Sequence, residues 1–394
     1  MKGLVSQRSQ VVEIASRLGA RPIVAFDTEF VREKTFFPQL GLIQVADQDE
    51  AWLIDPLALS AADLGPLLDV FTDPNVLKVA HAIDQDQECL YHYAGVVASP
   101  VLDTTIAAGL TGYGEQIGLA ALLQKLLRVR LAKGHTRTDW LRRPLSTAMA
   151  DYALADVAYL VAAAEKLLAD LEGRGRRDWA LDLSAAYAEP SRYQTNADAV
   201  TERLAAGSRL DELEYAVLRN LVEWREKWVR EVDRPRRWLA DDKVLVRLAR
   251  AQPAGREDLA QFRGLGVKAG SPRAEELVQA IQRGLDTPPE NRVSPPKSPR
   301  PESNEAPALS LLKCFVNQLA GEHAVAVRYL VGPEALLLLL RSDLKSLDEL
   351  QESTILNDGT VDLLGQQLIE FLQGRIGLKL SRGKVVQLDP AAES

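Results

Sequence analysis

This chain of 394 residues has few of the features that mark secreted, membrane or zinc-binding proteins. Its two cysteines, Cys89 and Cys314, lie far apart, so we expect no disulfide framework, no disulfide-linked partner and no cysteine-based zinc site. No apolar run reaches the about 18 residues that a membrane span needs, and residues 1–10 lack the apolar core of a signal peptide. We therefore expect a cytoplasmic protein with no membrane partner.

The clearest positive feature is a set of acidic residues in the first 160 positions. Asp27 and Glu29 lie in the apolar run 23–30, whose β-branched and aromatic residues predict a strand. Side chains two apart on a strand share a face. Two carboxylates on an apolar strand repel each other and lose hydration unless a cation joins them. Hard oxygen ligands of this kind suit Mg²⁺ or Mn²⁺.

A second pair has helical spacing. Residues 146–172 carry an apolar periodicity that predicts one long amphipathic helix, with Ser146 or Thr147 as its N-cap. Tyr152 and Asp156 are four apart in it and so are neighbours on one face. Such a pair occurs by chance in many helices, and it gains weight only from the other acids.

The remaining acid is harder to place. The stretch 81–88 follows the apolar run 76–80 and reads as a strand end that turns into a helix. Spacing alone does not choose among Asp84, Asp86 and Glu88. We expect His81 to be a packed residue or a hydrogen-bonding neighbour of the site rather than a metal ligand.

Together these segments resemble the ribonuclease D family, in the DEDD superfamily of 3′-to-5′ exonucleases with tyrosine in the third motif. The first motif is matched by residues 26–30 and the third by residues 152–160. In the second motif of the family, the metal-binding acid lies five residues after a histidine, which corresponds to Asp86 after His81 in this chain. Residues 138–145 are close to the family's S-D-W-x-x-R-P-L. One departure is Ile83-Asp84-Gln85, where the family has small or polar residues and a Glu.

The resemblance implies a ribonuclease H-like α/β fold and a two-metal site for Mg²⁺ or Mn²⁺. The implied metal ligands are Asp27, Glu29, Asp86 and Asp156, with Tyr152 orienting the attacking water. The implied partner is the single-stranded 3′ end of RNA, transfer RNA precursors above all, and the product is a nucleoside 5′-monophosphate.

Two other functions compete with this one. A DNA exonuclease of the same superfamily would use the same catalytic residues, because the metal chemistry is indifferent to the 2′-hydroxyl. The match at 138–145 and the helical tail favour ribonuclease D. The third hypothesis is an inactive RNA-binding scaffold, and the intact acids argue against it.

The rest of the chain predicts further domains. We expect a nuclease domain over 1–200, with its core at 21–172, and an HRDC domain, a small helical module, over 201–287. A Pro-rich linker follows at 288–308. Residues 309–394 predict a small helical domain, with a second HRDC-like module as the natural analogy and a hairpin at 377–386. Within the nuclease core we expect strands at 22–30, 40–46, 51–54 and 76–80 and helices at 60–72, 86–94, 103–111 and 117–127.

The formal net charge of −8 hides local basic regions. Seven Lys or Arg and a single acid, Asp139, lie between Lys125 and Arg143, which predicts a rim that faces phosphates or a basic face that balances the acidic remainder. We expect Trp224 and Trp228 to be core residues rather than stacking platforms. The predicted nucleic-acid contacts are Lys133, Arg137, Arg142 and Arg143 in the nuclease domain and Arg234, Arg236 and Arg237 in the HRDC domain.

Overall fold

The computed structural model describes residues 3–131, 138–296 and 300–388, and the chain forms two compact units. The first comprises Met1–Glu29, Leu40–Pro190 and Pro299–Ser394, and the second Phe30–Gln39 and Ser191–Ser298. Within the described ranges, no helix is long and apolar enough to cross a membrane.

A five-stranded sheet forms the centre of the nuclease part, with strand order β3-β2-β1-β4-β5. β1 runs parallel to β4, and β4 parallel to β5, whereas β2 and β3 are antiparallel. Val24, Ala25 and Phe26 of β1 are fully buried, as expected for a parallel strand covered on both faces. The strands are β1 (Ile23–Val31), β2 (Gln39–Ala46), β3 (Ala51–Ile54), β4 (Leu77–Ala80) and β5 (Val101–Asp103).

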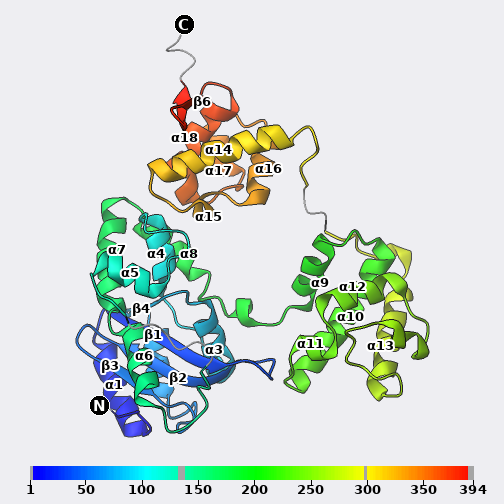
Figure 1. The fold of residues 1–394 in the computed structure, drawn as a ribbon, viewed down its shortest axis with the longest axis horizontal. Coiled ribbons are helices and arrows are strands. Elements are labelled where there is room, and N and C mark those ends of the chain that lie inside the picture. The colour runs from blue at the N-terminus through cyan, green and yellow to red at the C-terminus, as the bar shows by residue number, and fades with distance from the viewer. Residues whose placement is uncertain (1–2, 132–137, 297–299, 389–394) are drawn as a thin grey trace. The chain divides into compact units, whose positions relative to one another are not determined.

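In the described part of the nuclease segment the sheet is accompanied by helices α1 to α8, most of which are labelled in Figure 1. The α/β fold class is the predicted one, and each of the four predicted strands is present. The short β5 and the first helix were not expected from the sequence. The helices are α1 (Arg8–Gly19), α2 (Gly65–Thr72), α3 (Asp84–Ala94), α4 (Thr104–Leu110), α5 (Leu119–Leu126), α6 (Thr147–Val157), α7 (Leu160–Gly173) and α8 (Arg177–Ala185), followed by the 3₁₀ turn η1 (Pro190–Tyr193).

The single long helix predicted over 146–172 is wrong. The structure has two helices there, α6 and α7, which are separated at Ala158 and Tyr159. Val157 and Leu160 are both buried on either side of the break. The apolar pattern therefore continues across the break, and the hydrophobic periodicity does not reveal where one helix ends and the next begins.

The C-terminal segment is helical and ends in the predicted hairpin, β6 (Gly377–Ser381) and β7 (Lys384–Leu388). Arg382 and Gly383 connect the strands with φ angles of 50° and 77°, as in a two-residue turn that matches strand twist. The segment shares one apolar core with α4 and α7, and Ala326 N donates to Gly109 O at 2.8 Å. Its helices are α14 (Ala306–Glu322), α15 (Val327–Leu330), α16 (Pro333–Arg341), α17 (Leu347–Glu352) and α18 (Asp358–Leu372).

The second unit is a helical module around its own apolar core. Trp224 is 7% exposed in that core, as predicted, and the ring of the partly buried Trp228 lies 4.4 Å from the Arg273 guanidinium. Arg225 and Glu226 are both fully buried and form an ion pair at 2.9 Å. The helices are α9 (Ala197–Ala206), α10 (Glu212–Glu231), α11 (Arg236–Leu239), α12 (Asp242–Ala251) and α13 (Pro272–Leu285), with 3₁₀ turns η2 (Glu257–Gln261) and η3 (Pro289–Asn291).

Candidate active site

Strand β1 supplies two acids from one face. Asp27 and Glu29 are partly exposed, whereas Thr28 between them is 5% exposed. This alternation follows from the two-residue repeat of a strand, which sends alternate side chains to opposite faces. The two carboxylates therefore project together, as their spacing predicts.

Helix α3 supplies the third acid, and a sharp turn sets its direction. Ala82 has a φ of 61°, which redirects the chain from β4 into α3. The Asp103 carboxylate holds this turn, because it accepts hydrogen bonds from Ala82 N at 3.0 Å and Ile83 N at 3.2 Å. Asp103 also caps α4 through Thr105 N at 2.7 Å. A single buried aspartate thus joins the end of β5 to the start of α3.

Asp86 is bound directly to strand β1. Its Oδ1 accepts hydrogen bonds from Thr28 N at 3.0 Å and Thr28 Oγ1 at 2.5 Å, across 58 positions of sequence. The last paired residues of β1 and β4 are Ala25 and Val79, so β4 provides no backbone partner for Thr28. The Asp86 carboxylate accepts the Thr28 N–H hydrogen bond that a strand carbonyl would otherwise accept. Asp86 is 6% exposed and Asp84 is exposed. The turn thus directs Asp86, and not Asp84, toward the other acids.

His81 has both ring nitrogens in hydrogen-bonding contacts. Its Nδ1 lies 2.9 Å from Thr104 Oγ1, and its Nε2 lies 3.0 Å from Ile117 O. Burial lowers the pKa of this histidine. These contacts fit the packed role expected of it.

Helix α6 supplies the tyrosine and the fourth acid. Ser146 is its N-cap, with Oγ accepting from Met149 N at 3.2 Å. Tyr152 and Asp156 lie one turn apart, and the Tyr152 hydroxyl donates to the Asp156 carboxylate. The Trp140 ring centroid lies 6.2 Å from that of Tyr152. The predicted pair is therefore in direct contact.

The acids crowd one another. Asp27, Glu29 and Asp156 each offer an oxygen, and these three atoms all lie within 4.8 Å of one another. Burial and then the charges of Asp156 and Asp86 raise the pKa of Glu29 to about 8. Burial, followed by the charges of Asp86, Asp156 and Glu29, raises the pKa of Asp27 well above its ordinary value. Such a cluster is costly to ionise without a cation.

Asp86 and Asp156 show the same effect more weakly, because each accepts a hydrogen bond that favours its charged form. Burial raises the pKa of Asp86 to about 7, against the lowering effect of the two bonds from Thr28. Burial raises the pKa of Asp156 to about 6, against the lowering effect of the Tyr152 hydroxyl.

This donor set fits divalent cations. Among the ion pairs within the described residues, none involves Asp27, Glu29, Asp86 or Asp156. Four carboxylates without a Lys or Arg partner are hard oxygen ligands whose charge a bound cation would compensate. Asp27, Glu29 and Asp156 are close enough together to hold such a cation.

The segment 138–145 packs beside the acidic cluster, where Arg143 and Trp140 make most of its contacts. The Arg143 guanidinium binds the Asp55 carboxylate at 2.6 and 2.9 Å, Gly41 O at 2.6 Å and Trp140 O at 2.9 Å. These bonds hold Trp140 beside Tyr152, and the prediction that Arg143 contacts nucleic acid stays a prediction. Arg142 is exposed, and Lys133 and Arg137 lie outside the described residues.

The arginines predicted in the second unit differ from one another. Arg236 forms a bidentate pair with the buried Glu226, at 2.7 and 2.8 Å, and its predicted contact with RNA stays a prediction. Arg234 is exposed and lies 5.5 Å from the centroid of the exposed Trp238 ring, and Arg237 is also exposed.

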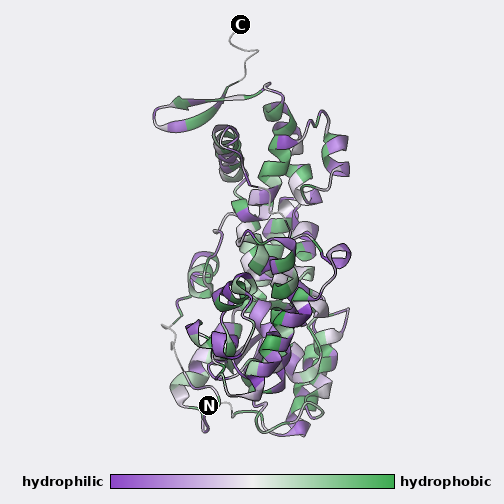
Figure 2. Ribbon diagram, turned by 90° about the vertical axis from the view of Figure 1, so that its right-hand side faces the viewer, coloured by the Kyte–Doolittle hydropathy of each residue, from purple (hydrophilic) through white to green (hydrophobic). Residues whose placement is uncertain are grey.

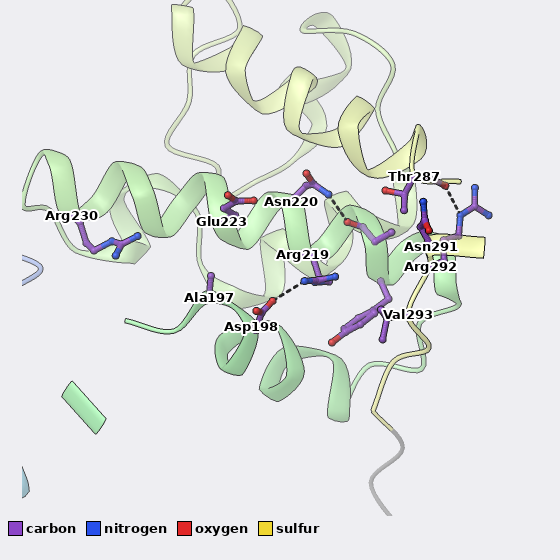
Figure 3. A pocket seen from close by; sticks show the side chains of 12 residues that line it. Ala197, Asp198, Arg219, Asn220, Glu223, Arg230, Thr287, Asn291, Arg292 and Val293 are labelled. Carbon is purple, nitrogen blue, oxygen red and sulfur yellow. Dashed lines mark hydrogen bonds and ion pairs between the residues drawn. The ribbon is translucent and has the colours of Figure 1, made fainter. Parts of the chain in front are cut away.

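A different face of that unit contains a hollow of about 500 Å³ beside α10 (Figure 3). The predicted arginines do not line it. Arg219, Arg230 and Arg292 do, from α10 and the segment after η3. Arg219 pairs there with Asp198 at 3.0 Å. Nothing in the sequence distinguishes these three arginines from other surface arginines.

The Thr28 hydroxyl gives a sharp test of how the cluster is held. Thr28→Val keeps the shape and the backbone donor but removes one hydrogen bond to Asp86, and we expect Mn²⁺ affinity to fall about tenfold, as for other residues that orient a metal ligand. Thr28→Ser should restore it. Calorimetric titration with Mn²⁺ measures this, with unfolding in EDTA as the check that folding is intact. Equal affinity of the Val variant and the wild type would contradict the account.

The raised pKa values predict how the stability of the metal-free protein depends on pH. The folded cluster holds protons up to about pH 8, whereas unfolded carboxyls lose theirs near pH 4. The folded state then binds more protons than the unfolded state, so the free energy of unfolding should fall as pH rises from 5 to 8. Urea unfolding in EDTA measures this slope. Asp27→Asn combined with Glu29→Gln should flatten it, and an equal slope in that variant would contradict the prediction.

Comparisons with known proteins agree with this geometry. Residues 4–172 match a family described as 3′-5′ exonuclease, and residues 214–281 match the HRDC domain. Ribonuclease D of Nitrobacter hamburgensis is 32% identical over 389 residues, covering 98% of this chain and 99% of the relative. That of Bartonella henselae is 33% identical over 387 residues, covering 98% and 93%.

A solved structure is similar over nearly the whole chain. It is Escherichia coli RNase D, described as an exoribonuclease involved in structured RNA processing, with a TM-score of 0.78 and 26% identity over 94% of this chain and 98% of that one. The acidic cluster therefore lies in an exonuclease domain that is followed by an HRDC domain. The chain belongs to the ribonuclease D family of 3′-to-5′ exoribonucleases.

Proposed function

We propose that this enzyme trims the single-stranded 3′ ends of structured RNA precursors, transfer RNA above all, and releases nucleoside 5′-monophosphates one at a time. The main support for the proposal is the acidic cluster, in which β1, α3 and α6 bring four carboxylates together and the Tyr152 hydroxyl is hydrogen-bonded to one of them. The four acids are Asp27, Glu29, Asp86 and Asp156, and the partner of Tyr152 is Asp156. The described role of the E. coli relative in structured RNA processing supports the choice of substrate.

In this proposal the four acids hold two divalent ions, Mg²⁺ or Mn²⁺. When bound, such ions activate a water and stabilise the leaving oxygen. Tyr152 orients the attacking water through its hydroxyl. Burial and the neighbouring carboxylates raise the pKa of Tyr152 well above its usual value, so at neutral pH the phenol keeps the proton that it donates to Asp156. Its oxygen would then position the water by accepting a hydrogen bond from it rather than by removing a proton.

The remaining assignments are also proposals. We propose a nuclease domain over 1–200, an HRDC domain over 201–287, a linker over 288–308 and an auxiliary C-terminal domain over 309–394, acting in the cytoplasm. Basic side chains would contact the RNA backbone outside the active site. The residues proposed for these contacts are Lys133, Arg137, Arg142, Arg143, Arg234, Arg236 and Arg237, of which Lys133 and Arg137 lie outside the described residues.

The substrate class can be tested with two 5′-labelled single strands of equal sequence, one RNA and one DNA, incubated with the protein and Mg²⁺ or Mn²⁺. We expect a ladder that shortens from the 3′ end on RNA alone. Equal degradation of DNA would indicate a DNA exonuclease of the same superfamily. Absence of a ladder on both strands would contradict the proposal and favour an RNA-binding scaffold.

The proposed roles predict different losses for two variants. Asp27→Asn removes a metal ligand and should abolish nearly all turnover at any Mg²⁺ concentration. Tyr152→Phe removes an orienting hydroxyl but no ligand, so its single-turnover rate should fall by a smaller factor, about 10- to 100-fold. Wild-type rates in Tyr152→Phe would remove the orienting role, and activity in Asp27→Asn would overturn the site assignment.

A further inference from the structure

The C-terminal segment contains an open groove of about 910 Å³ between α14 and the β6–β7 hairpin. One wall is a stripe along α14 and the other is Lys384 and Val385 of β7. The α14 residues in the lining are Ser310, Lys313, Cys314, Asn317, Gln318, Gly321 and Glu322. They recur every three to four positions and so form one face of the helix.

This stripe is the face that α14 does not use for packing. The opposite face buries Leu312, Phe315, Val316 and Leu319 in the core of the first unit. The groove face presents an ammonium group at Lys313 and amides at Asn317 and Gln318. Glu322, the acid of this stripe, lies at its end and accepts a hydrogen bond from Gln318 Nε2 at 2.9 Å.

The hairpin concentrates positive charge. Residues 375–388 contain four basic side chains and no acidic one, although residues 305–394 as a whole carry eight basic and twelve acidic side chains. Lys379, Arg382 and Lys384 are all exposed. Half of the basic residues of this acidic segment therefore lie on the hairpin or just before it.

The strand pairing places these charges together and away from the core. Ser381 pairs with Lys384 and Lys379 with Val386, so Lys379 and Lys384 lie diagonally on one face. Leu378 near the base packs against the core, whereas Leu380 near the tip is 81% exposed. Figure 2 shows the hairpin as a two-stranded ribbon that extends beyond the helices of its segment.

We infer that this groove and hairpin bind single-stranded RNA. Lys313 and Lys384 on the two walls would contact phosphates, together with Lys379 in the middle of β6 and Arg382 at the turn. The amides of Asn317 and Gln318 would meet base edges. A polyanion is the occupant that a cationic ribbon on an acidic segment complements. The inference rests on the proposed RNA substrate, to which it adds a binding site outside the catalytic cluster.

The first experiment measures affinity for a labelled 20-nucleotide single-stranded RNA by fluorescence anisotropy, with the full chain in EDTA at several salt concentrations. Lys384→Glu should weaken binding at least several-fold and reduce the slope of log affinity against log salt by about one. Lys384→Arg should retain wild-type affinity. Lys345→Glu makes the same charge change at an exposed lysine of this segment outside the groove and should change neither quantity.

A second measurement uses Cys314, which lines the groove, whereas Cys89 is 1% exposed. Bound RNA should slow maleimide labelling of Cys314 in the wild type and much less in Lys384→Glu.

Unchanged RNA affinity in Lys384→Glu, or equal losses of affinity in Lys345→Glu, would overturn the inference and make a protein partner the next occupant to test. If the wild-type chain forms a 3′ ladder on RNA but Lys384→Glu binds RNA with wild-type affinity, only the inference about the groove is refuted. The proposed function then stands.

Discussion

Mutual repulsion of carboxylates at one end of strand β1 is the constraint on which the rest of the active site depends. Asp27, Glu29 and Asp156 place oxygens within 4.8 Å of one another, and the structure around them has to maintain this contact. Thr28 ties Asp86 to the strand, Asp103 holds the turn into α3, and Tyr152 is bonded to Asp156. The hydrogen bonds from Thr28 and Tyr152 favour the charged forms of Asp86 and Asp156 and so offset part of the cost of crowding negative charge, whereas Asp103 positions the turn and adds a negative charge of its own. A cation would offset the rest, which is why the arrangement is best understood as a metal site.

Much of the fold could be predicted from the sequence because its signals are local. The apolar runs of β1, β2 and β4 are direct consequences of burial, and these strands formed where expected. The break between α6 and α7 was missed because Val157 and Leu160 continue one apolar stripe across it. The three-residue β5 was missed because so short a strand is defined by its pairing with β4 rather than by its own residues.

The active site shows the same division between features set by local spacing and features set by contacts with distant parts of the chain. The spacing in the sequence placed Asp27 beside Glu29, because residues two apart share a face of a strand. It placed Tyr152 beside Asp156, because residues four apart are about one turn of helix apart. Spacing could not choose among Asp84, Asp86 and Glu88, since that choice depends on the backbone turn at Ala82 and on Asp103, 17 residues after Asp86 in sequence. Arg143 and Arg236 were assigned to RNA from local charge alone. Their partners, Asp55 and Glu226, lie outside their own sequence segments, so only the folded chain reveals those pairs.

The central claim is that the cluster around Asp27 is a two-metal site. An anomalous difference map from crystals of the wild-type protein soaked in Mn²⁺ tests it most directly. The account predicts two peaks about 3.5–4 Å apart, contacted by oxygens of Asp27, Glu29, Asp86 and Asp156. A map with no peak among these four carboxylates, at Mn²⁺ concentrations that support hydrolysis, would contradict it.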